Sequence, residues 1–278
     1  MPTDFDKLWD YSKPDETEKK FRQLLSEAER ANDPSYLAQL LTQIARTQGL
    51  QNRFDEAHAT LDRVEKMLTD DLKLARIRYL LERGRVFNSS GKPDRAMPLF
   101  VQASELAIAE KENRYAIDAI HMIAIAEPDP QKQVEWNLKG IAMAQADPEQ
   151  RGWLFSLYNN IAESYALLKD YQSALSYINK LIDFQRERGE ADPYTLKDKA
   201  RFHRLLGHPD ESLAIIQKVA ETKPNDGWIE EELAESLEAL GRTDEAKPHF
   251  EKAYELLSKD DWCVRHEQAK LKRLKERM

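Results

Sequence analysis

A helical pattern that recurs along the chain constrains its fold more than any other feature of the sequence. In residues 155–181, a first apolar run at helical spacing includes Tyr158 and Ala162. A short polar turn around Asp170 follows, and a second run at the same spacing starts at Ala174. The two alanines fall where paired helices approach most closely, and larger residues flank them. The segment therefore predicts a helical hairpin.

Five further segments carry related patterns, so the sequence holds six copies. Ser212 of the fifth copy is 34 residues from its counterpart Ala246, whereas the earlier intervals are 38 to 40 residues. We attribute the additional residues, about one helical turn, to longer second helices and inter-repeat loops. The third copy has a shortened turn at residues 127–130, where we expect local distortion. The copies lie near residues 38–71, 77–110, 117–146, 155–188, 193–226 and 227–260.

The residue types at fixed offsets in these copies resemble the tetratricopeptide repeat (TPR). In the last copy they are Leu233, Leu237, Gly241, Ala246 and Phe250. The resemblance covers residues 35–260 and is of a bacterial type in which some repeats have 38–40 residues. It implies an all-α fold, a right-handed α-solenoid of about six TPR-like helical hairpins in which each hairpin buries its apolar face against the next.

Both ends of such an array need capping helices, because a terminal repeat has no neighbour on one side. Residues 1–34 hold an N-terminal segment and a predicted capping helix that starts at Pro14. Residues 261–278 predict one basic C-terminal capping helix, with Val264 and Met278 on its apolar side. With two helices per repeat, the caps bring the expected total to about 14 helices.

Composition favours an all-helical chain and limits its partners. Only 9 Gly and 12 Pro in 278 residues leave little material for β-hairpins or phosphate loops. The net charge of −8 argues against a general nucleic-acid binder. Residues 1–30 contain neither a signal core nor a membrane span, and the single Cys263 cannot form an internal disulfide. We therefore expect a cytoplasmic protein that binds neither nucleic acid nor membranes.

No constellation of residues in the sequence indicates catalysis. Gly84 and Gly91 are spaced too widely for a phosphate loop and are interpreted as a helix position and a turn. The six histidines lack metal-ligand spacing, and we expect His203 to be a partly buried packing residue. The three glutamates at 230–232 are expected to form a solvated helix start. The sequence therefore predicts that the chain is not an enzyme and holds no metal and no cofactor.

In the TPR family the first helix of each repeat lines a concave groove that holds a peptide, so the resemblance assigns inner helix positions to partner binding. Cations are frequent there, and we expect Arg46, Arg78 and Arg85 to be exposed and compatible with an acidic partner. The enrichment can equally be accidental, because Arg and Lys are common on any solvated helix. The tryptophans can equally pack between repeats or anchor a ligand. The predicted partner-binding residues are Arg46, Arg78, Arg85, His121, Asn159, Glu163, Tyr194, Lys197, Arg201 and Trp228.

These observations predict a non-catalytic protein–protein interaction scaffold that binds an unidentified protein or peptide in the groove of a TPR array. The alternative is a TPR-type regulatory or signalling protein that responds to a peptide or a response regulator. A hydrolase or phosphatase hidden in the groove stays open as a third reading. The sequence leaves open the oligomeric state, and also whether the groove, the outer face or the C-terminal helix binds the partner.

Overall fold

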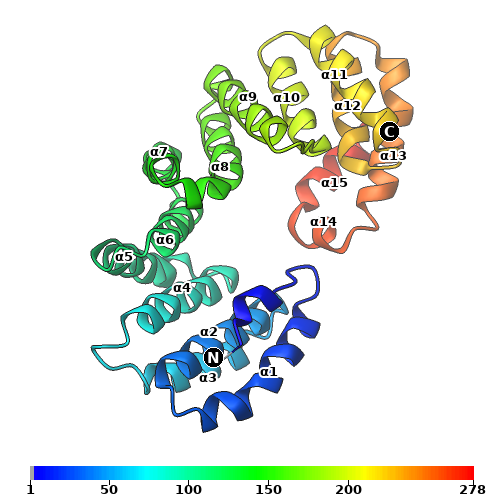
Figure 1. Cartoon of the computed structure of the whole chain (residues 1–278). Coiled ribbons are helices and arrows are strands. Elements are labelled where there is room, and N and C mark those ends of the chain that lie inside the picture. Colours follow the sequence, from blue (N-terminus) through cyan, green and yellow to red (C-terminus); the bar gives the residue numbers. More distant parts are fainter. Residues whose placement is uncertain (1–2) are drawn as a thin grey trace. The chain divides into compact units, whose positions relative to one another are not determined.

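A computed structural model describes residues 3–278, and over this range the chain forms fifteen α-helices, two 3-10 helices and no strand. The fold is therefore all-α, as predicted, and consists of helical hairpins (Figure 1). Two units divide the chain, with the boundary between Trp153 and Leu154. The N-terminal unit comprises η1 (Phe5–Leu8), α1 (Pro14–Arg30), α2 (Pro34–Leu50), α3 (Phe54–Glu65), α4 (Lys73–Ser89), α5 (Pro93–Ala109), α6 (Asn113–Ala126), α7 (Pro130–Ala146) and η2 (Pro148–Trp153). The C-terminal unit comprises α8 (Leu154–Leu167), α9 (Tyr171–Glu187), α10 (Pro193–Leu205), α11 (Pro209–Thr222), α12 (Gly227–Ala239), α13 (Thr243–Leu257), α14 (Asp261–His266) and α15 (Gln268–Lys275).

The turns within the hairpins follow from residues that stop one helix and start the next. Gly91 takes φ 75° just after α4, and the Lys92 N–H donates to the Phe87 carbonyl at 2.9 Å. Pro93 then opens α5, where its missing N–H costs no intrahelical bond. The segment around Gly91 is therefore an inter-helix turn, as predicted. The prediction of a shortened turn at residues 127–130 is wrong, because the turn between α6 and α7 has three residues, as many as the turn around Gly91, and differs from that turn in having no residue at positive φ.

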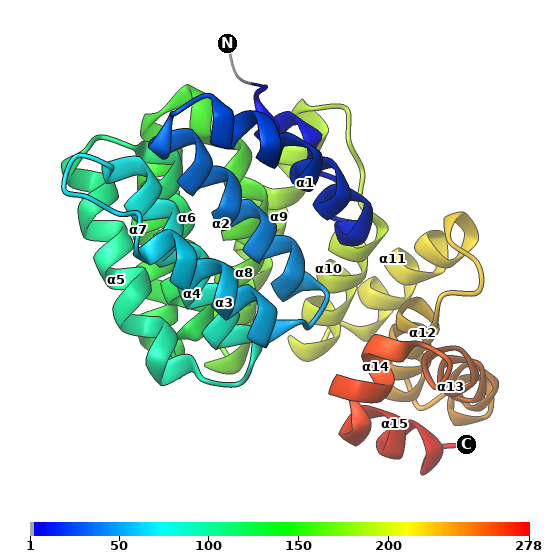
Figure 2. The ribbon, with the colours of Figure 1, turned by 90° about the horizontal axis from the view of Figure 1, so that it is seen from below.

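Within each unit, helices that follow each other pack together, and first helices of neighbouring repeats also touch. Figure 2 shows this arrangement for α2, α3 and α4, which lie side by side. Small residues allow the close approach. Ala162 of α8 and Ala174 of α9 are both fully buried in a packed helix pair, as predicted. In the α4–α5 pair, the absence of a Cβ on Gly84 makes room for the buried ring of Phe100.

The two ends differ in how well the sequence predicted them. The N-terminal capping helix is confirmed as α1, which starts at Pro14. The prediction of a single C-terminal capping helix is wrong, because the helix breaks at Glu267 into α14 and α15. Val264 and Met278 are exposed, whereas Cys263 and Leu274 are buried. The break lets α15 bury Leu274 against α13 while its cations reach α12, and it raises the helix count above the expected one.

Residues 3–278 contain neither a helix that could cross a membrane nor a cluster of metal-ligating side chains. None of their helices is both long and apolar enough to cross a membrane. No group of three or more His, Cys, Asp or Glu side chains among them is arranged to hold a metal ion. His203 is half-buried on α10, as the sequence predicted.

Candidate functional site

Within each unit, charged side chains link the first helix of one repeat to the first helix of the next. These helices are α2, α4 and α6 in the N-terminal unit, and α8, α10 and α12 in the C-terminal unit, with α15 next in line. Partners on different helices lie 28 to 42 residues apart, about one repeat, because stacking brings neighbouring positions of successive repeats together. We name the two rows the N-terminal ladder (Arg46, Glu82, Arg85, Asp118) and the C-terminal ladder (Glu163, Arg201, Arg204, Glu231, Glu232, Glu235, Lys270, Arg273, Arg277).

The N-terminal ladder is centred on the buried carboxylate of Glu82. Its Oε1 accepts from Arg46 Nη1 at 3.0 Å and from Arg85 Nη1 at 2.8 Å. Arg85 also donates to Asp118 on the next first helix. Each cation therefore lies against at least one carboxylate, and the row is electrically balanced rather than basic.

This balance shifts the pKa values of two neighbouring groups on α6. Burial disfavours the charged form of Asp118, but the guanidiniums of Arg85 and Arg46 outweigh burial and lower the pKa of this carboxyl group. Burial also lowers the pKa of His121, although Asp118 acts in the opposite direction. His121 packs against Trp153, with ring centroids 5.6 Å apart. The structure therefore favours a charged Asp118 beside a neutral His121.

The expectation that Arg46, Arg78 and Arg85 are exposed is wrong. Arg78 is only 4% exposed and pairs with Asp6 and with the hydroxyl of Tyr115. Carboxylates one repeat away, and one from the N-terminal segment, cover the cations that the sequence pattern placed at open positions. Whether these three residues bind a partner stays a prediction.

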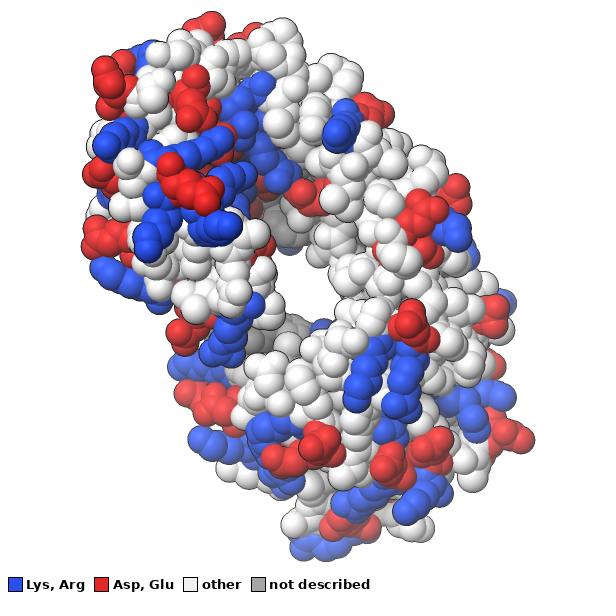
Figure 3. All heavy atoms as spheres, turned by 180° about the vertical axis from the view of Figure 1, so that it is seen from behind, with Lys and Arg blue, Asp and Glu red and all other residues white. Residues whose placement is uncertain are grey.

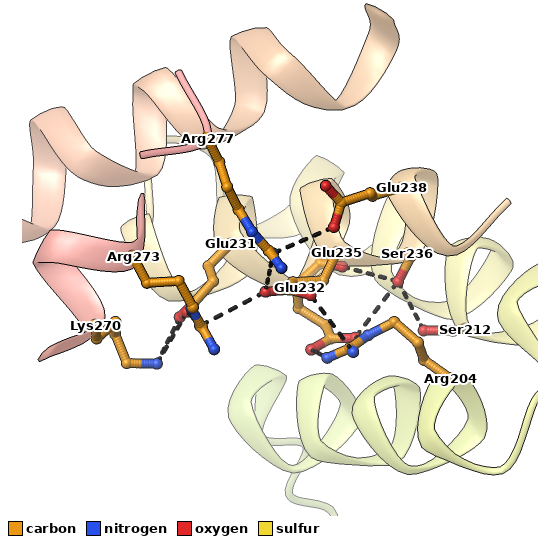
Figure 4. A network of polar contacts seen from close by, with 10 residues as sticks. All are labelled: Arg204, Ser212, Glu231, Glu232, Glu235, Ser236, Glu238, Lys270, Arg273 and Arg277. Carbon is orange, nitrogen blue, oxygen red and sulfur yellow. Dashed lines mark hydrogen bonds and ion pairs between the residues drawn. The ribbon is translucent and has the colours of Figure 1, made fainter. Parts of the chain in front are cut away.

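The C-terminal ladder runs from α8 through α10 and α12 to the cap, and Figure 4 shows its part from Arg204 to Arg277. Arg201 of α10 donates to Glu163 of α8. Arg204, one turn further along α10, forms a two-pronged pair with Glu232 of α12 at 2.7 and 2.8 Å. On the other side of α12, Lys270 Nζ of α15 lies 2.7 Å from Glu231 Oε2. The ladder therefore ties α15 to the last repeat through charged groups.

The prediction that the glutamates at 230–232 form a solvated helix start is wrong. All three are buried, and each pairs with a different element. Glu230 meets His249 and Lys252 of α13, at 2.6 and 2.7 Å. Glu231 and Glu232 meet α15 and α10, as described above. Adjacent helix residues point in different directions, so three consecutive carboxylates hold three neighbouring helices.

A cavity of about 390 Å³ opens between α10, α12 and the α15 segment within the C-terminal unit. Three predicted residues line it, namely Lys197, Arg201 and Trp228, together with members of the C-terminal ladder. Lys270 Nζ lies 4.7 Å from the centroid of the half-buried Trp228 ring. The cavity therefore offers one aromatic face within a rim of paired charges of both signs.

The other predicted residues lie elsewhere. Arg46, Arg78, Arg85 and His121 belong to the N-terminal unit. Asn159 and Glu163 are half-buried on α8, outside the cavity lining, although Glu163 reaches Arg201. The hydroxyl of Tyr194 is held by Asp226 at 2.7 Å and by Lys223 at 2.6 Å. The structure therefore brings together three of the ten predicted residues in one cavity.

Sequence reasoning missed the partners that complete the ladders, above all Glu82, Glu232, Lys270 and Arg273. A usable signal was present, because each charge of one sign has an opposite charge about one repeat away in the sequence. Balanced charge is also visible on the surface, where basic and acidic side chains lie beside one another on the face shown in Figure 3.

The comparisons with known proteins agree with the repeat architecture. A family model described as tetratricopeptide repeat matches residues 155–188 and 232–258. These are the fourth predicted copy and most of the sixth. No curated protein matches the chain.

Several solved structures share the fold at low sequence identity. A tetratricopeptide repeat protein from Parabacteroides merdae has a TM-score of 0.59 and 17% identity, covering 98% of both chains. A Podosopora anserina kinesin light chain structure with nearly identical TPR-like repeats has a TM-score of 0.56 and 19% identity, covering 66% of this chain and 95% of that one. A structure of the APC/C hetero-tetramer Cut9–Hcn1 has a TM-score of 0.59 and 14% identity, covering 92% of this chain and 46% of that one. At these identities the likeness concerns the fold alone.

Proposed function

Because the chain is a tetratricopeptide-repeat protein, we propose that it is a non-catalytic scaffold that binds a protein or peptide partner along the inner sides of its first helices. The observation that carries this proposal is the cavity between α10, α12 and α15. It is open and mainly charged at its rim, with Trp228 as its aromatic anchor. A stretch of partner chain can lay an apolar side chain on Trp228 while its polar groups meet the ladder.

An acidic partner segment fits this cavity because two of its paired cations are still partly exposed. Lys270 and Arg273 are both held by Glu231, and Arg204 by Glu232. The side chains of Arg273 and Lys270 keep 48% and 20% of their surface exposed, so a carboxylate of the partner can accept from them while Glu231 stays paired. Lys197 is satisfied locally by its neighbour Asp198, at 2.8 Å, so its release disturbs no link between helices. We therefore assign Lys197 to direct contact with the partner.

In this proposal the protein acts in the cytoplasm and the cavity catalyses no reaction. Glu231, Glu232 and Glu235, which line the cavity, are paired with cations, so none of these three is placed as a free general base. Cys263 is a free, fully buried thiol, which is compatible with a reducing compartment such as the cytoplasm.

A pull-down from the native cell with the full chain as bait tests this function. The comparison is between Lys197→Ala, in the cavity, and Lys218→Ala, an exposed lysine of α11 on a different helix. We expect the first variant to lose a protein that the parent and the second variant both retain. Retention of every captured protein by both variants would contradict the assignment to this cavity. The class of the captured protein also distinguishes a scaffold from a regulator that acts on a response regulator.

A further inference from the structure

The N-terminal segment (residues 4–11) lies across the first helices of the N-terminal unit. It contains three aromatic residues, three aspartates and one lysine. Asp6 pairs with Arg78 of α4, and the Arg78 guanidinium lies 5.2 Å from the centroid of the Phe5 ring. Phe5 is buried against Phe21 and Tyr36, with ring centroids 6.2 and 5.3 Å apart. One aromatic and one acidic side chain of the segment therefore engage helices α1, α2 and α4.

A second pair of aromatic residues makes the next contact along α2. Trp9 Nε1 donates to Gln43 Oε1 at 3.0 Å, and Trp9 stacks on Tyr11 with centroids 4.6 Å apart. The Arg46 guanidinium lies over both rings, at 5.8 and 5.4 Å from their centroids. Arg46 and Arg78, which the sequence assigned to partner binding, are thus both occupied by the chain's own N-terminus.

These contacts are of the kind by which a binding groove recognises a peptide. The segment has a single 3-10 turn, and it meets α2 and α4 through three aromatic side chains and the acidic Asp6. The fit is incomplete, because the buried atoms Arg78 Nη1 and Arg46 Nε have no hydrogen-bond partner. A ligand with further acceptors at these two points would satisfy groups that the segment leaves unpaired.

We propose that one surface of the N-terminal unit is a second peptide site, formed by Tyr36, Gln43, Arg46, Arg78 and Tyr115. The site recognises a partner segment in which an acidic residue directly follows an aromatic residue and a tryptophan lies three positions after the acidic residue. Residues Phe5, Asp6 and Trp9 are the chain's own copy of this pattern and occupy the site until the partner displaces them. The inference rests on the proposed function only in that inner helix faces bind peptides, since it concerns the other unit.

Because the N-terminal segment is tethered to the site, it can occupy the site through weak contacts and still be displaced by a partner. A ligand on a short tether acts at an effective concentration of about millimolar, so weak contacts suffice to keep it bound. A partner that fills the unused hydrogen-bond capacity of Arg46 and Arg78 can exceed this advantage. Loosening the segment should therefore increase the affinity for a free peptide of the same sequence.

The test uses a fluorescent peptide with residues 3–13 as the probe and the full chain as the receptor. The receptor variant Asp6→Lys with Trp9→Ala removes the two main contacts of the segment, and Lys7→Ala is the control within the same segment, because the Lys7 side chain is exposed and pairs with Asp4 at the surface. We expect the double variant to bind the peptide about tenfold or more tightly than the parent, and the control to bind like the parent. A peptide that carries the same two changes should bind neither.

Equal affinity of the parent and the double variant, or equal binding of the changed peptide, would overturn the proposal. If the double variant fails to fold by circular dichroism, amide exchange in the parent decides instead. Millimolar probe peptide should then speed exchange in residues 4–11 and leave α2 protected, and unchanged exchange would refute the site. Dimerisation of the parent that Asp6→Lys abolishes would reassign the occupant to a second copy of this chain. Binding at Lys197 of the C-terminal unit is independent of all these outcomes.

Discussion

Glu232 of α12 accepts both prongs of the Arg204 guanidinium of α10, with Nε–Oε1 at 2.7 Å and Nη2–Oε2 at 2.8 Å. Burial raises the pKa of Glu232, although Arg204 acts against this shift. Neither residue would be stable in this position alone, since each is largely withdrawn from water. The pair therefore acts as one structural unit that joins two repeats, and such units recur along both ladders.

Removing one member of this pair should cost far more than removing both. Glu232→Ala leaves the Arg204 guanidinium without its main acceptor, and we expect a loss of about 3 kcal/mol in the free energy of unfolding. Urea denaturation measures it. The double variant with Arg204→Met should recover a large part of the loss, because no charge is then left uncompensated. Strictly additive losses in the double-mutant cycle would show that the two side chains are not coupled.

Charge reversal on the N-terminal ladder should destabilise the fold rather than merely change a surface. Arg85→Glu places a third carboxylate beside Glu82 and Asp118, so we expect a loss of about 3 kcal/mol or more. The control is Arg186→Glu, at an exposed residue of α9 that pairs with an exposed aspartate, for which we expect a change within about 0.5 kcal/mol. Similar stabilities of the two variants would contradict the burial of the ladder.

Two Gly→Ala substitutions should change the free energy of unfolding in opposite directions. Gly84→Ala would place a Cβ against the fully buried ring of Phe100, and we expect a loss of about 1 to 3 kcal/mol. Gly49→Ala meets only Val86 Cγ2 at an ordinary 3.5 Å, and should stabilise α2 by about 0.5 to 1 kcal/mol. Thermal denaturation of both variants checks the pair, and stabilisation by Gly84→Ala would disprove the close approach of α4 and α5.

Overpacking should also reveal the register of the α8–α9 hairpin. Ala174 is fully buried, so Ala174→Leu adds volume that the interface cannot accept, and we expect a loss of about 1 to 3 kcal/mol. Ala239→Leu adds the same volume at an exposed position at the end of α12. Only the first variant should lower the melting temperature, and an unchanged value for Ala174→Leu would mean that the predicted register is wrong.

Acid should weaken the N-terminal unit in part through His121. Burial holds the pKa of this imidazole below its ordinary value of 6.5, with Arg85 and Arg46 acting in the same direction and Asp118 against them. The neutral form is favoured in the folded state, so the stability that it contributes is present above pH 6.5 and is lost as the pH falls below that value. His121→Phe keeps the ring beside Trp153. Its melting temperature should fall less than that of the parent between pH 7 and pH 5, and equal falls would exclude this role for His121.

The sequence by itself determined the repeats, because each repeat is a local unit. Small positions such as Ala162 and Ala174, and turn residues such as Gly91, follow from helix period and backbone preference within about 34 residues of chain. For the same reason the start of α1 at Pro14 was predictable. The turn at residues 127–130 was visible in the prolines it contains.

Only the tertiary structure decided which charged residues are free and which are paired. Arg46 and Arg85 read as open cations because their helix period places them at inner positions. What covers them is Glu82 and Asp118, one repeat away, while Asp6 reaches Arg78 from the N-terminal segment. The break at Glu267 likewise serves contacts between α15 and both α12 and α13, which no local preference encodes. A helix period fixes the direction in which a side chain points, but the partner that it meets there depends on how distant segments stack, and stacking is decided by packing over the whole unit.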